Sequence, residues 1–343
     1  MNFEQQLKIL VYFHLEEHTS GRHLLQALEE DVFARTEIAP PQGIKKSSFF
    51  EATNTRGLEQ LAYVFEQLYA QAYNTLPCQY SELGELIAID GSLIDAVLSM
   101  YWADYRDGSK KAKVHLGFDI NHRIPSKIFF SSGKDAERPF VTKILSRGQT
   151  GIMDRGYQCH KRFDCWQKEG KYYVCRIKAN TTKTTIRTNK VNENSIVFYD
   201  EIVFLGTPNV NQTEEEVRLI AYRVNGKEYW VATNRFDLTA EQIAMIYKLR
   251  WEIEQFFAWW KRHLKVYHLI ARSEYGLMVQ MLAGLITYLL ITIYCHENYN
   301  EKVSIRRVRE LRTAIRNEIH ALDLSKSTAQ KIKTEKYNPY AKT

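Results

Sequence analysis

The sequence predicts a mixed α/β fold in which a helical segment precedes a sheet flanked by helices. Through residues 1–75 apolar residues recur at helical spacing, whereas from about residue 85 they gather in short runs bounded by turn residues. Later, helix patterns alternate with strand patterns, an order that is typical of a mixed sheet. At 343 residues, of which 45% are hydrophobic, the chain is long enough for two or more domains.

The N-terminal part is predicted to be a set of short helices. Helical periodicity runs through FEQQLKILVYFHL, GRHLLQALEEDVF and RGLEQLAYVFEQLYAQAY. Pro40, Pro41 and Gly43 interrupt this pattern, and Ser47 or Ser48 is predicted to cap the next helix. The basic KKSS turn between short helices fits a helix-turn-helix element, and it fits a helical packing domain equally well.

The middle of the chain is predicted to be rich in strands. The runs ELIAID, KAKVHLGFDI, IPSKIFFSS, QTGIMD and YYVCRIK are predicted strands, and YQCHKRFDCWQKEG is a predicted helix. Residues 180–236 form a further β-prone block with a hairpin turn at Asn225-Gly226. Because this block separates the first α/β part from the helices that follow, we interpret it as an insertion.

The stretch from Tyr247 to Leu264 is predicted to be one helix with a polar stripe beside its apolar one. At about 100° per residue, the core-facing positions are Leu249, Ile253, Phe256, Phe257, Trp260 and Leu264. The polar stripe, within an arc of roughly 60°, holds Tyr247, Arg250, Glu254 and Lys261. Lys248 and Glu252 fall on a third, solvent-side face. Since Arg250 and Glu254 are four residues apart, the stripe by itself fits a surface ion-pair ladder as well as a functional site.

The sequence predicts a cytoplasmic protein without a membrane partner. Its five cysteines form no CxxC pair, and the start MNFEQQLKIL lacks a secretory pattern, so reduced thiols are expected. Leu277–Cys295 is nineteen residues without a charge, which is close to spanning length. Gln280, Thr287 and Thr292 interrupt it, and no companion segment exists, so we predict a buried core helix.

The positive charge of the chain is unevenly distributed. The net charge is +7, but residues 1–85 hold six Lys or Arg against twelve Asp or Glu, a net of −6. Residues 302–343 hold eleven against four, a net of +7, which leaves +6 for residues 86–301. The basic middle and tail suit an anionic polymer as partner.

Three acids form a pattern that suits metal-dependent chemistry. Asp90 in AIDGS and Asp154 in MDRGY each end an apolar run, which alone is typical of an Asp that begins a turn. At the ends of central strands, however, such residues lie where open α/β sheets place their sites. With Glu254 they make a set of hard oxygen ligands, which suits Mg²⁺ or Mn²⁺. Two such ions can stabilise both oxygens of a phosphoryl displacement.

These residues together resemble a known family. The chain is similar to DDE transposases of bacterial insertion sequences, in the Insertion Sequence Four family, over residues 85–296. The family signature is Tyr, two residues, Arg, three residues, Glu, six residues, Lys, and it matches Tyr247, Arg250, Glu254 and Lys261. The first two acids of the family match Asp90 and Asp154, and its β-rich insertion matches residues 180–236. The resemblance implies an RNase H-like core.

The resemblance also implies roles for the matched residues. Asp90 would bridge two Mg²⁺ ions, with Mn²⁺ as a substitute, and Asp154 and Glu254 would hold one each. Arg250 and Lys261 would contact phosphates near the cut, and Tyr247 would donate a hydrogen bond to a phosphate oxygen. Metal-activated water would cut the element's end, and the freed 3′-hydroxyl would attack target DNA.

Further DNA contacts are expected outside the signature. Trp251 and Trp230 are suited either to stacking on a flipped base or to core packing. The acid-free run that begins at Arg176, within the predicted strand YYVCRIK, is a candidate for backbone contact, or else a solvated basic loop. Its cations are Arg176, Lys178, Lys183, Arg187 and Lys190.

The predicted domain organisation follows from these assignments. The expected segments are 1–80 (helical, binding DNA ends), 85–179 (first part of the RNase H-like core), 180–236 (insertion), 237–298 (signature helices) and 299–343 (basic helix and tail, loosely ordered after about residue 325). The predicted partners are the element's terminal inverted repeats and target DNA, bound by a homodimer at the bacterial nucleoid. Two alternatives remain: a nuclease of the same fold that cuts without joining, and an inactive transposase-derived repressor.

Overall fold

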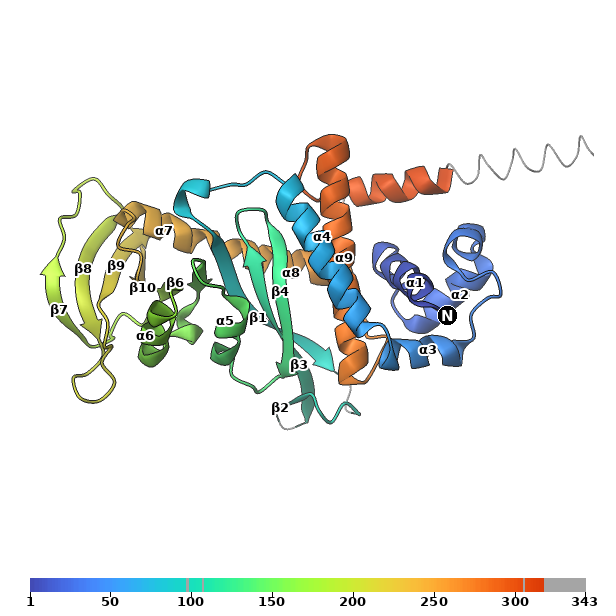
Figure 1. Cartoon of the computed structure of the whole chain (residues 1–343), viewed down its shortest axis with the longest axis horizontal. Helices are drawn as coiled ribbons and strands as arrows, with labels where there is room; N and C mark the ends of the chain where they lie inside the picture. The colour runs from blue at the N-terminus through green and yellow to red at the C-terminus, as the bar shows by residue number, and fades with distance from the viewer. Residues whose placement is uncertain (97–98, 107, 305, 318–343) are drawn as a thin grey trace, which may run out of the picture. The chain divides into compact units, whose positions relative to one another are not determined.

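The chain divides into two compact units in the computed structural model, which describes all residues except 97–98, 107, 305 and 318–343 (Figure 1). Among the described residues, the helical unit comprises those within 1–64, 263–271 and 275–317, and the sheet unit comprises those within 65–262 and 272–274. The predicted loose tail after residue 325 lies outside the described residues.

The helical unit begins with the short helices that the apolar periodicity predicts. They are α1 (Phe3–Leu15), α2 (Gly21–Glu30), the π-helical turn η1 (Ala34–Ile38), α3 (Lys46–Thr55) and the start of α4 (Leu58–Thr75). The predicted N-cap at Ser47 or Ser48 is wrong. Lys45 already has the extended backbone of an N-cap, so α3 begins at Lys46 without a side-chain cap.

The long apolar stretch forms α9 (Glu274–Tyr299). By length and composition alone α9 could cross a membrane, but 89% of its most apolar window is buried within the protein. Its Gln280 is fully buried, and both polar ends of its side chain are hydrogen-bonded: Oε1 accepts the N–H of Ile270 at 2.9 Å, and Nε2 donates to the carbonyl of His268 at 2.8 Å. The structure groups most of α9 with the N-terminal helices, whereas the sequence groups it with the signature helices.

The sheet unit is built on one mixed sheet. Its ten strands among the described residues are β1 (Leu86–Ala96), β2 (Asp104–Arg106), β3 (Ser109–Asp119), β4 (Ile124–Ser132), β5 (Thr150–Met153), β6 (Tyr172–Arg176), β7 (Lys183–Thr188), β8 (Val197–Leu205), β9 (Val217–Val224) and β10 (Lys227–Thr233). They lie in the order β2-β3-β1-β5-β6-β10-β9-β8-β7, with β4 paired to β3. The pairs β1–β5 and β5–β6 are parallel. The predicted mixed α/β fold is confirmed.

The helices and turns of this unit frame the sheet. They are the end of α4, η2 (Ser81–Leu83), α5 (Arg138–Ile144), η3 (Arg155–Tyr157), α6 (His160–Lys168), α7 (Ala240–Leu249) and α8 (Trp251–His263). Buried aromatic rings anchor α6: Phe163 stacks on Tyr173 of β6 with ring centroids 4.5 Å apart, and Trp166 is fully buried beside them. This packing holds the segment between β5 and α6, which carries Asp154.

The block at residues 180–236 continues the central sheet instead of folding as a separate layer. Its last strand, β10, pairs antiparallel with β6, with Val231 opposite Arg176. The predicted hairpin turn is confirmed, because Asn225 and Gly226 both have positive φ, 50° and 75°, between β9 and β10. The strands β7 to β10 therefore extend the sheet that holds the first two acids (Figure 1).

A buried ion pair ties the outer strands to the helix that follows them. Arg218 of β9 donates to both carboxylate oxygens of Asp200 of β8, at 3.0 and 2.7 Å. It also donates to the carbonyl of Leu238, which precedes the N-cap Thr239 of α7, at 2.5 Å. Burial raises the pKa of Asp200, but hydrogen bonds from Arg218 and Asn189 outweigh burial and leave that pKa below its usual value. The pair thus fixes where α7 begins.

Replacing Arg218 with Met should lower the free energy of unfolding by about 3–5 kcal/mol, because Asp200 would stay buried without its partner. Urea unfolding of the whole chain measures the loss. Arg223→Met is the control, since Arg223 lies on the same strand in an exposed pair with Glu228 and should cost less than about 1 kcal/mol. Equal losses in the two variants would contradict this role for Arg218.

Candidate active site

The strand register brings the first two acids to the same level of the sheet. In the parallel pair β1–β5, Leu86 lies opposite Thr150 and Ala88 opposite Ile152. The same register two residues further on places Asp90 opposite Asp154, where β5 has just ended. Neighbouring strands lie about 4.8 Å apart, and residues at one level point to the same face. The two carboxylates are therefore neighbours.

The sequence predicted that Asp90 ends its strand, and this prediction is wrong. Strand β1 runs on to Ala96, because its antiparallel pairing with β3 continues from Asp90 opposite Leu116 to Ala96 opposite Lys110. What ends at this level is the parallel partner β5. Asp154 caps η3 through its Oδ1, which accepts the N–H of Gly156 at 2.7 Å. Of the two parallel strands, only β5 therefore ends at the level of Asp90, and β1 continues past it.

The Asp90 carboxyl sits in an environment that disfavours its charge. Its pKa is raised to about 7, chiefly by burial, and the carboxylates of Asp154 and Glu137 contribute to this rise. Two groups lower this pKa: the N–H of Gly91, which donates to Oδ1 at 2.8 Å, and the Arg250 guanidinium. The protein itself thus leaves the negative charge of Asp90 undercompensated.

Glu137 is a fourth acid at this place, and sequence reasoning missed it. It precedes α5, and a Cβ built on Gly91 would lie only 2.8 Å from its Oε1, so the side chain lies against β1 next to Asp90. The same oxygen is 3.4 Å from Nζ of Lys113. A hydrogen bond with Glu137 also contributes, after burial, to the raised pKa of Tyr157. No motif surrounds Glu137, so the sequence carried no signal for it.

The helix expected from Tyr247 to Leu264 is two helices. Helix α7 ends at Leu249, Arg250 forms the junction, and α8 begins at Trp251. Of the predicted apolar stripe, Ile253, Phe256, Phe257, Trp260 and Leu264 are buried, but Leu249 is only partly so. Glu252 does not face solvent, because its Oε1 accepts from Nη2 of Arg123 at 2.8 Å and both side chains are about three-quarters buried.

The junction aims Arg250 between two acids. Its Nη2 donates to Oε1 of Glu254 at 2.5 Å, and its positive charge lowers the pKa of Asp90. The Tyr247 ring lies 5.8 Å from the guanidinium carbon and is itself buried. The expected ion pair between residues 250 and 254 therefore exists. Its side chains are only 15% and 33% exposed, so it is not part of a surface ion-pair ladder.

Lys261 completes the signature further along β1. Its Nζ donates to the carbonyl of Leu93, three residues beyond Asp90, at 2.8 Å. Burial lowers its pKa. The structure thus brings Asp90, Asp154, Tyr247, Arg250 and Glu254 together and sets Lys261 at the adjoining stretch of β1.

The remaining predicted contacts lie outside this cluster. Trp251 is 57% exposed. Trp230 is partly buried, with Nζ of Lys183 at 4.6 Å over its ring and the tilted Tyr199 ring 5.0 Å away. Lys183 is accordingly no solvated loop residue. Exposed Arg187 and Lys190 line a hollow of about 520 Å³ near the start of α7, and exposed Lys178 follows β6.

The acids fit a divalent cation in chemistry, and their assembly is incomplete. Carboxylate oxygens without His or Cys are the ligands that Mg²⁺ prefers, and an undercompensated Asp90 beside Asp154 is suited to a cation. Within the described part of the chain, however, no three His, Cys, Asp or Glu side chains lie close enough together to hold a metal. The Glu254 carboxylate is instead paired with Arg250.

Comparison with known proteins assigns the chain to a family. The family model described as Transposase DDE domain matches residues 82–290, which include all three acids and the signature. The chain is 28% identical over 192 residues to "Probable transposase for insertion sequence element IS5377" of Geobacillus stearothermophilus, covering 55% of this chain and 51% of that protein. The chain therefore spans about half the length of that relative.

Two further relatives are also named as transposases. The chain is 26% identical over 259 residues to "Putative transposase for insertion sequence element IS4SA" of Synechocystis sp., covering 72% of this chain and 71% of that protein. It is also 26% identical over 204 residues to "Putative transposase y4zB" of Sinorhizobium fredii, covering 57% of each. The mixed sheet is consistent with the RNase H-like core that the resemblance implies.

The raised pKa of Asp90 predicts a pH dependence of stability. Because folding raises this pKa from 3.8 to about 7, the free energy of unfolding should fall as the pH rises through that window, by up to about 4 kcal/mol. Asp90→Asn keeps the shape and cannot ionise, so it should be more stable than the wild type at pH 8, with the difference shrinking towards pH 5. Urea unfolding with a chelator present measures both chains.

The matched control is Asp95→Asn on the same strand, because the Asp95 side chain is 83% exposed. This variant should follow the pH curve of the wild type. Parallel curves for Asp90→Asn and the wild type would show that the fold does not disfavour the Asp90 charge.

Proposed function

The chain belongs to the Transposase DDE domain family, and on that basis we propose that it is a transposase of a bacterial insertion sequence. It binds the terminal inverted repeats, cuts them by metal-dependent hydrolysis and joins the freed 3′-hydroxyls to target DNA. The observation that carries this proposal is the β1–β5 register, which has Ala88 opposite Ile152 and, continued by two residues, would set Asp90 opposite Asp154. The pairing of Glu254 with Arg250, whose charge acts on Asp90, supports it. The signature at Tyr247, Arg250, Glu254 and Lys261 supports the Insertion Sequence Four family.

The three acids are the proposed metal ligands. Asp90 and Asp154 are already neighbours, and Glu254 joins them when its carboxylate leaves Arg250, four residues away on the helix. Two Mg²⁺ or Mn²⁺ ions bound at the proposed site would activate the attacking oxygen and stabilise the leaving oxygen. A cation would also offset the repulsion between Asp90 and its acidic neighbours, which the protein compensates only in part.

The basic signature residues are proposed to hold the DNA strand. If Glu254 served as a metal ligand, the planar fork of Arg250 would be free to take a phosphate in two hydrogen bonds. Lys261 lies beyond it along β1, and it would exchange the carbonyl of Leu93 for a phosphate oxygen. The Tyr247 hydroxyl is the third donor. Exposed Trp251 is the better placed of the two tryptophans to stack on a base, because Trp230 is partly buried and Lys183 lies over its ring.

The substrate implies the assembly and the place of action. Two element ends must be held together for joining, so we propose a homodimer on DNA. Action at the bacterial nucleoid, in the cytoplasm, follows from a chromosomal substrate. An assay with a labelled duplex that carries the element's end, Mg²⁺ and a target plasmid tests the whole proposal. Joined product supports a transposase, cut ends alone support a nuclease, and shifted bands alone support a DNA-binding repressor.

Glu254→Gln should reduce cleavage about a thousandfold, equivalent to roughly 4 kcal/mol in the barrier, while binding of end DNA persists. Glutamine keeps the shape and the helix propensity of Glu, and its amide oxygen can still accept from Arg250, so thermal unfolding should change little. Cleavage and unfolding are measured on one preparation. Glu216→Gln, at an exposed position, is the control, and equal cleavage by the two variants would remove Glu254 from the site.

Lys45 and Lys46 should contribute to recognition of the element's end. Both are exposed at the start of α3, and residues at the start of a recognition helix contact base edges in helix-turn-helix proteins. The double variant Lys45→Gln/Lys46→Gln should lower the affinity for end DNA more than the affinity for random duplex, as a fluorescence anisotropy titration measures. Lys8→Gln, an exposed change on α1 in a pair with Glu4, should alter neither affinity. An unchanged preference in the double variant would place end recognition elsewhere.

A further inference from the structure

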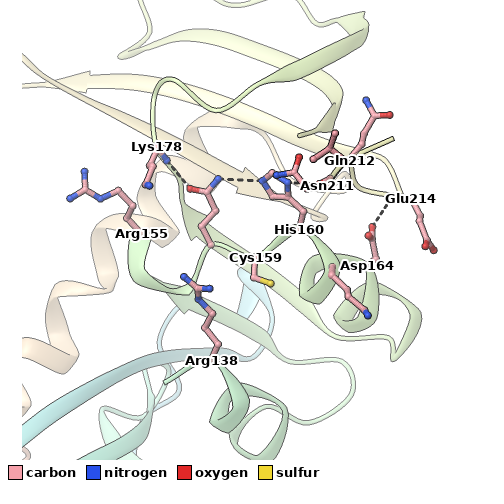
Figure 2. Close-up of a pocket in the computed structure, with 12 residues that line it drawn as sticks. Arg138, Arg155, Cys159, His160, Asp164, Lys178, Asn211, Gln212 and Glu214 are labelled. Carbon is pink, nitrogen blue, oxygen red and sulfur yellow. Dashed lines mark hydrogen bonds between the residues drawn. The ribbon is translucent and has the colours of Figure 1, made fainter. Parts of the chain in front are cut away.

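A hollow of about 670 Å³ lies next to the candidate active site within the sheet unit (Figure 2). Five elements build it: Arg138 opens α5, Arg155 lies in η3, Cys159 and Lys161 flank the start of α6, Lys178 follows β6, and Asn211 comes from the loop between β8 and β9. We name it the basic hollow. Its volume falls in the range of ligand sites, and nothing in the signature of the family points to it.

The basic hollow has a surplus of positive charge. Arg155, Lys161 and Lys178 are exposed, and within the described residues none of them forms an ion pair. Arg138 uses only its Nε, which donates to the carbonyl of Gly156 at 2.9 Å. Four cationic side chains therefore line the hollow with donors left to bind an anion.

The acids that line the basic hollow are already engaged. Oδ1 of Asp164 accepts the N–H groups of Glu214 and Glu215, at 3.1 and 3.0 Å. The Glu214 carboxylate pairs with Lys168, at 2.5 Å. In Figure 2, Arg138, Arg155 and Lys178 lie on one side of the view, and Asp164 and Glu214 lie on the other. The cationic side of the hollow is thus not neutralised by its acids.

This cationic side is continuous with the candidate active site. Arg155 directly follows Asp154, and Arg138 directly follows Glu137, whose carboxylate lies against Gly91 beside Asp90. Two of the hollow's cations are therefore each one residue away from an acid of the site. A polyanion with one phosphate at Asp90 and Asp154 would meet Arg155 and Arg138 next, and Lys178 beyond them.

We propose that the basic hollow binds consecutive phosphates of the DNA strand that leaves the active site on the Asp154 side. The proposal rests on the proposed function, since it takes DNA as the polymer. Arginine forks suit phosphodiester oxygens, and such contacts set the position of a strand without reading its sequence. The hollow thereby holds the DNA that flanks the reacting bond, whereas the signature residues hold the bond itself.

The first test measures binding without cutting. The full chain is titrated with a labelled duplex that carries the element's end, in a chelator and at several salt concentrations. Each phosphate contact contributes about 0.9 to the slope of log K against log salt, so Arg155→Gln/Lys178→Gln should lower the slope by about 1.8. Lys168→Gln is the control, because Lys168 lies nearby on α6 in its pair with Glu214, and its slope should match the wild type. A wild-type slope in the double variant would overturn the proposal.

The second test uses the wild-type chain, so it does not depend on a variant that folds. Cys159 is a free, partly exposed thiol that lines the basic hollow, and Cys78 is a free, exposed thiol outside it. Saturating duplex should slow alkylation of Cys159 several-fold and leave Cys78 unchanged, as peptide mapping records. Equal alkylation with and without DNA would overturn the proposal. Equal protection by inorganic phosphate alone would also overturn it, in favour of a small-anion site.

Experiment can refute the proposed transposase activity and the proposed role of the basic hollow independently of each other. A wild-type chain that protects Cys159 on DNA but never cuts with Mg²⁺ would remove the transposase activity and keep the hollow as a DNA site. A chain that cuts the element's end with an unprotected Cys159 would keep the activity and remove the hollow from the path of the strand.

Discussion

The parallel register between β1 and β5 is the constraint on which the candidate site depends. It places Asp90 and Asp154, which are 64 residues apart in the chain, at one level of adjacent strands. The backbone hydrogen bonds of the sheet hold this spacing, and a shift by one residue would turn one carboxylate to the opposite face. The aromatic packing of α6 on β6 and the ion pair between Arg218 and Asp200 both serve to keep neighbouring segments in place around this pair.

The same constraint has an electrostatic cost. Burial together with Asp154 and Glu137 disfavours the charge on Asp90, and the protein offers only the N–H of Gly91 and the guanidinium of Arg250 in return. Arg250 is shared with Glu254, so one cation is divided between two acids. An arrangement that leaves negative charge undercompensated is characteristic of functional sites, where stability is given up for a group that binds later.

Sheet continuity explains how distant segments reach this place. Because β10 pairs with β6, the strands of residues 180–236 belong to the sheet of the acids, and Arg218 fixes the start of α7 through Leu238. Helix α7 then delivers Tyr247 and, at the junction before α8, Arg250 to the sheet. The basic hollow arises from the same continuity, since α5 and α6 both begin at it, η3 lies between them in the chain, and the loop after β6 lines it as well.

The sequence by itself determined the mixed α/β class, most strands and helices, the hairpin at Asn225-Gly226 and the family to which the chain belongs, because periodicity, turn chemistry and short motifs are local properties. Only the tertiary structure decided that β1 runs past Asp90, that the helix breaks at Arg250, that Glu252 faces Arg123 and that Trp230 is partly buried. It alone placed Glu137 against Gly91 and Arg138 beside Arg155. These contacts join residues far apart in the chain, and their partners are selected by strand pairing and packing, which leave no trace in local spacing.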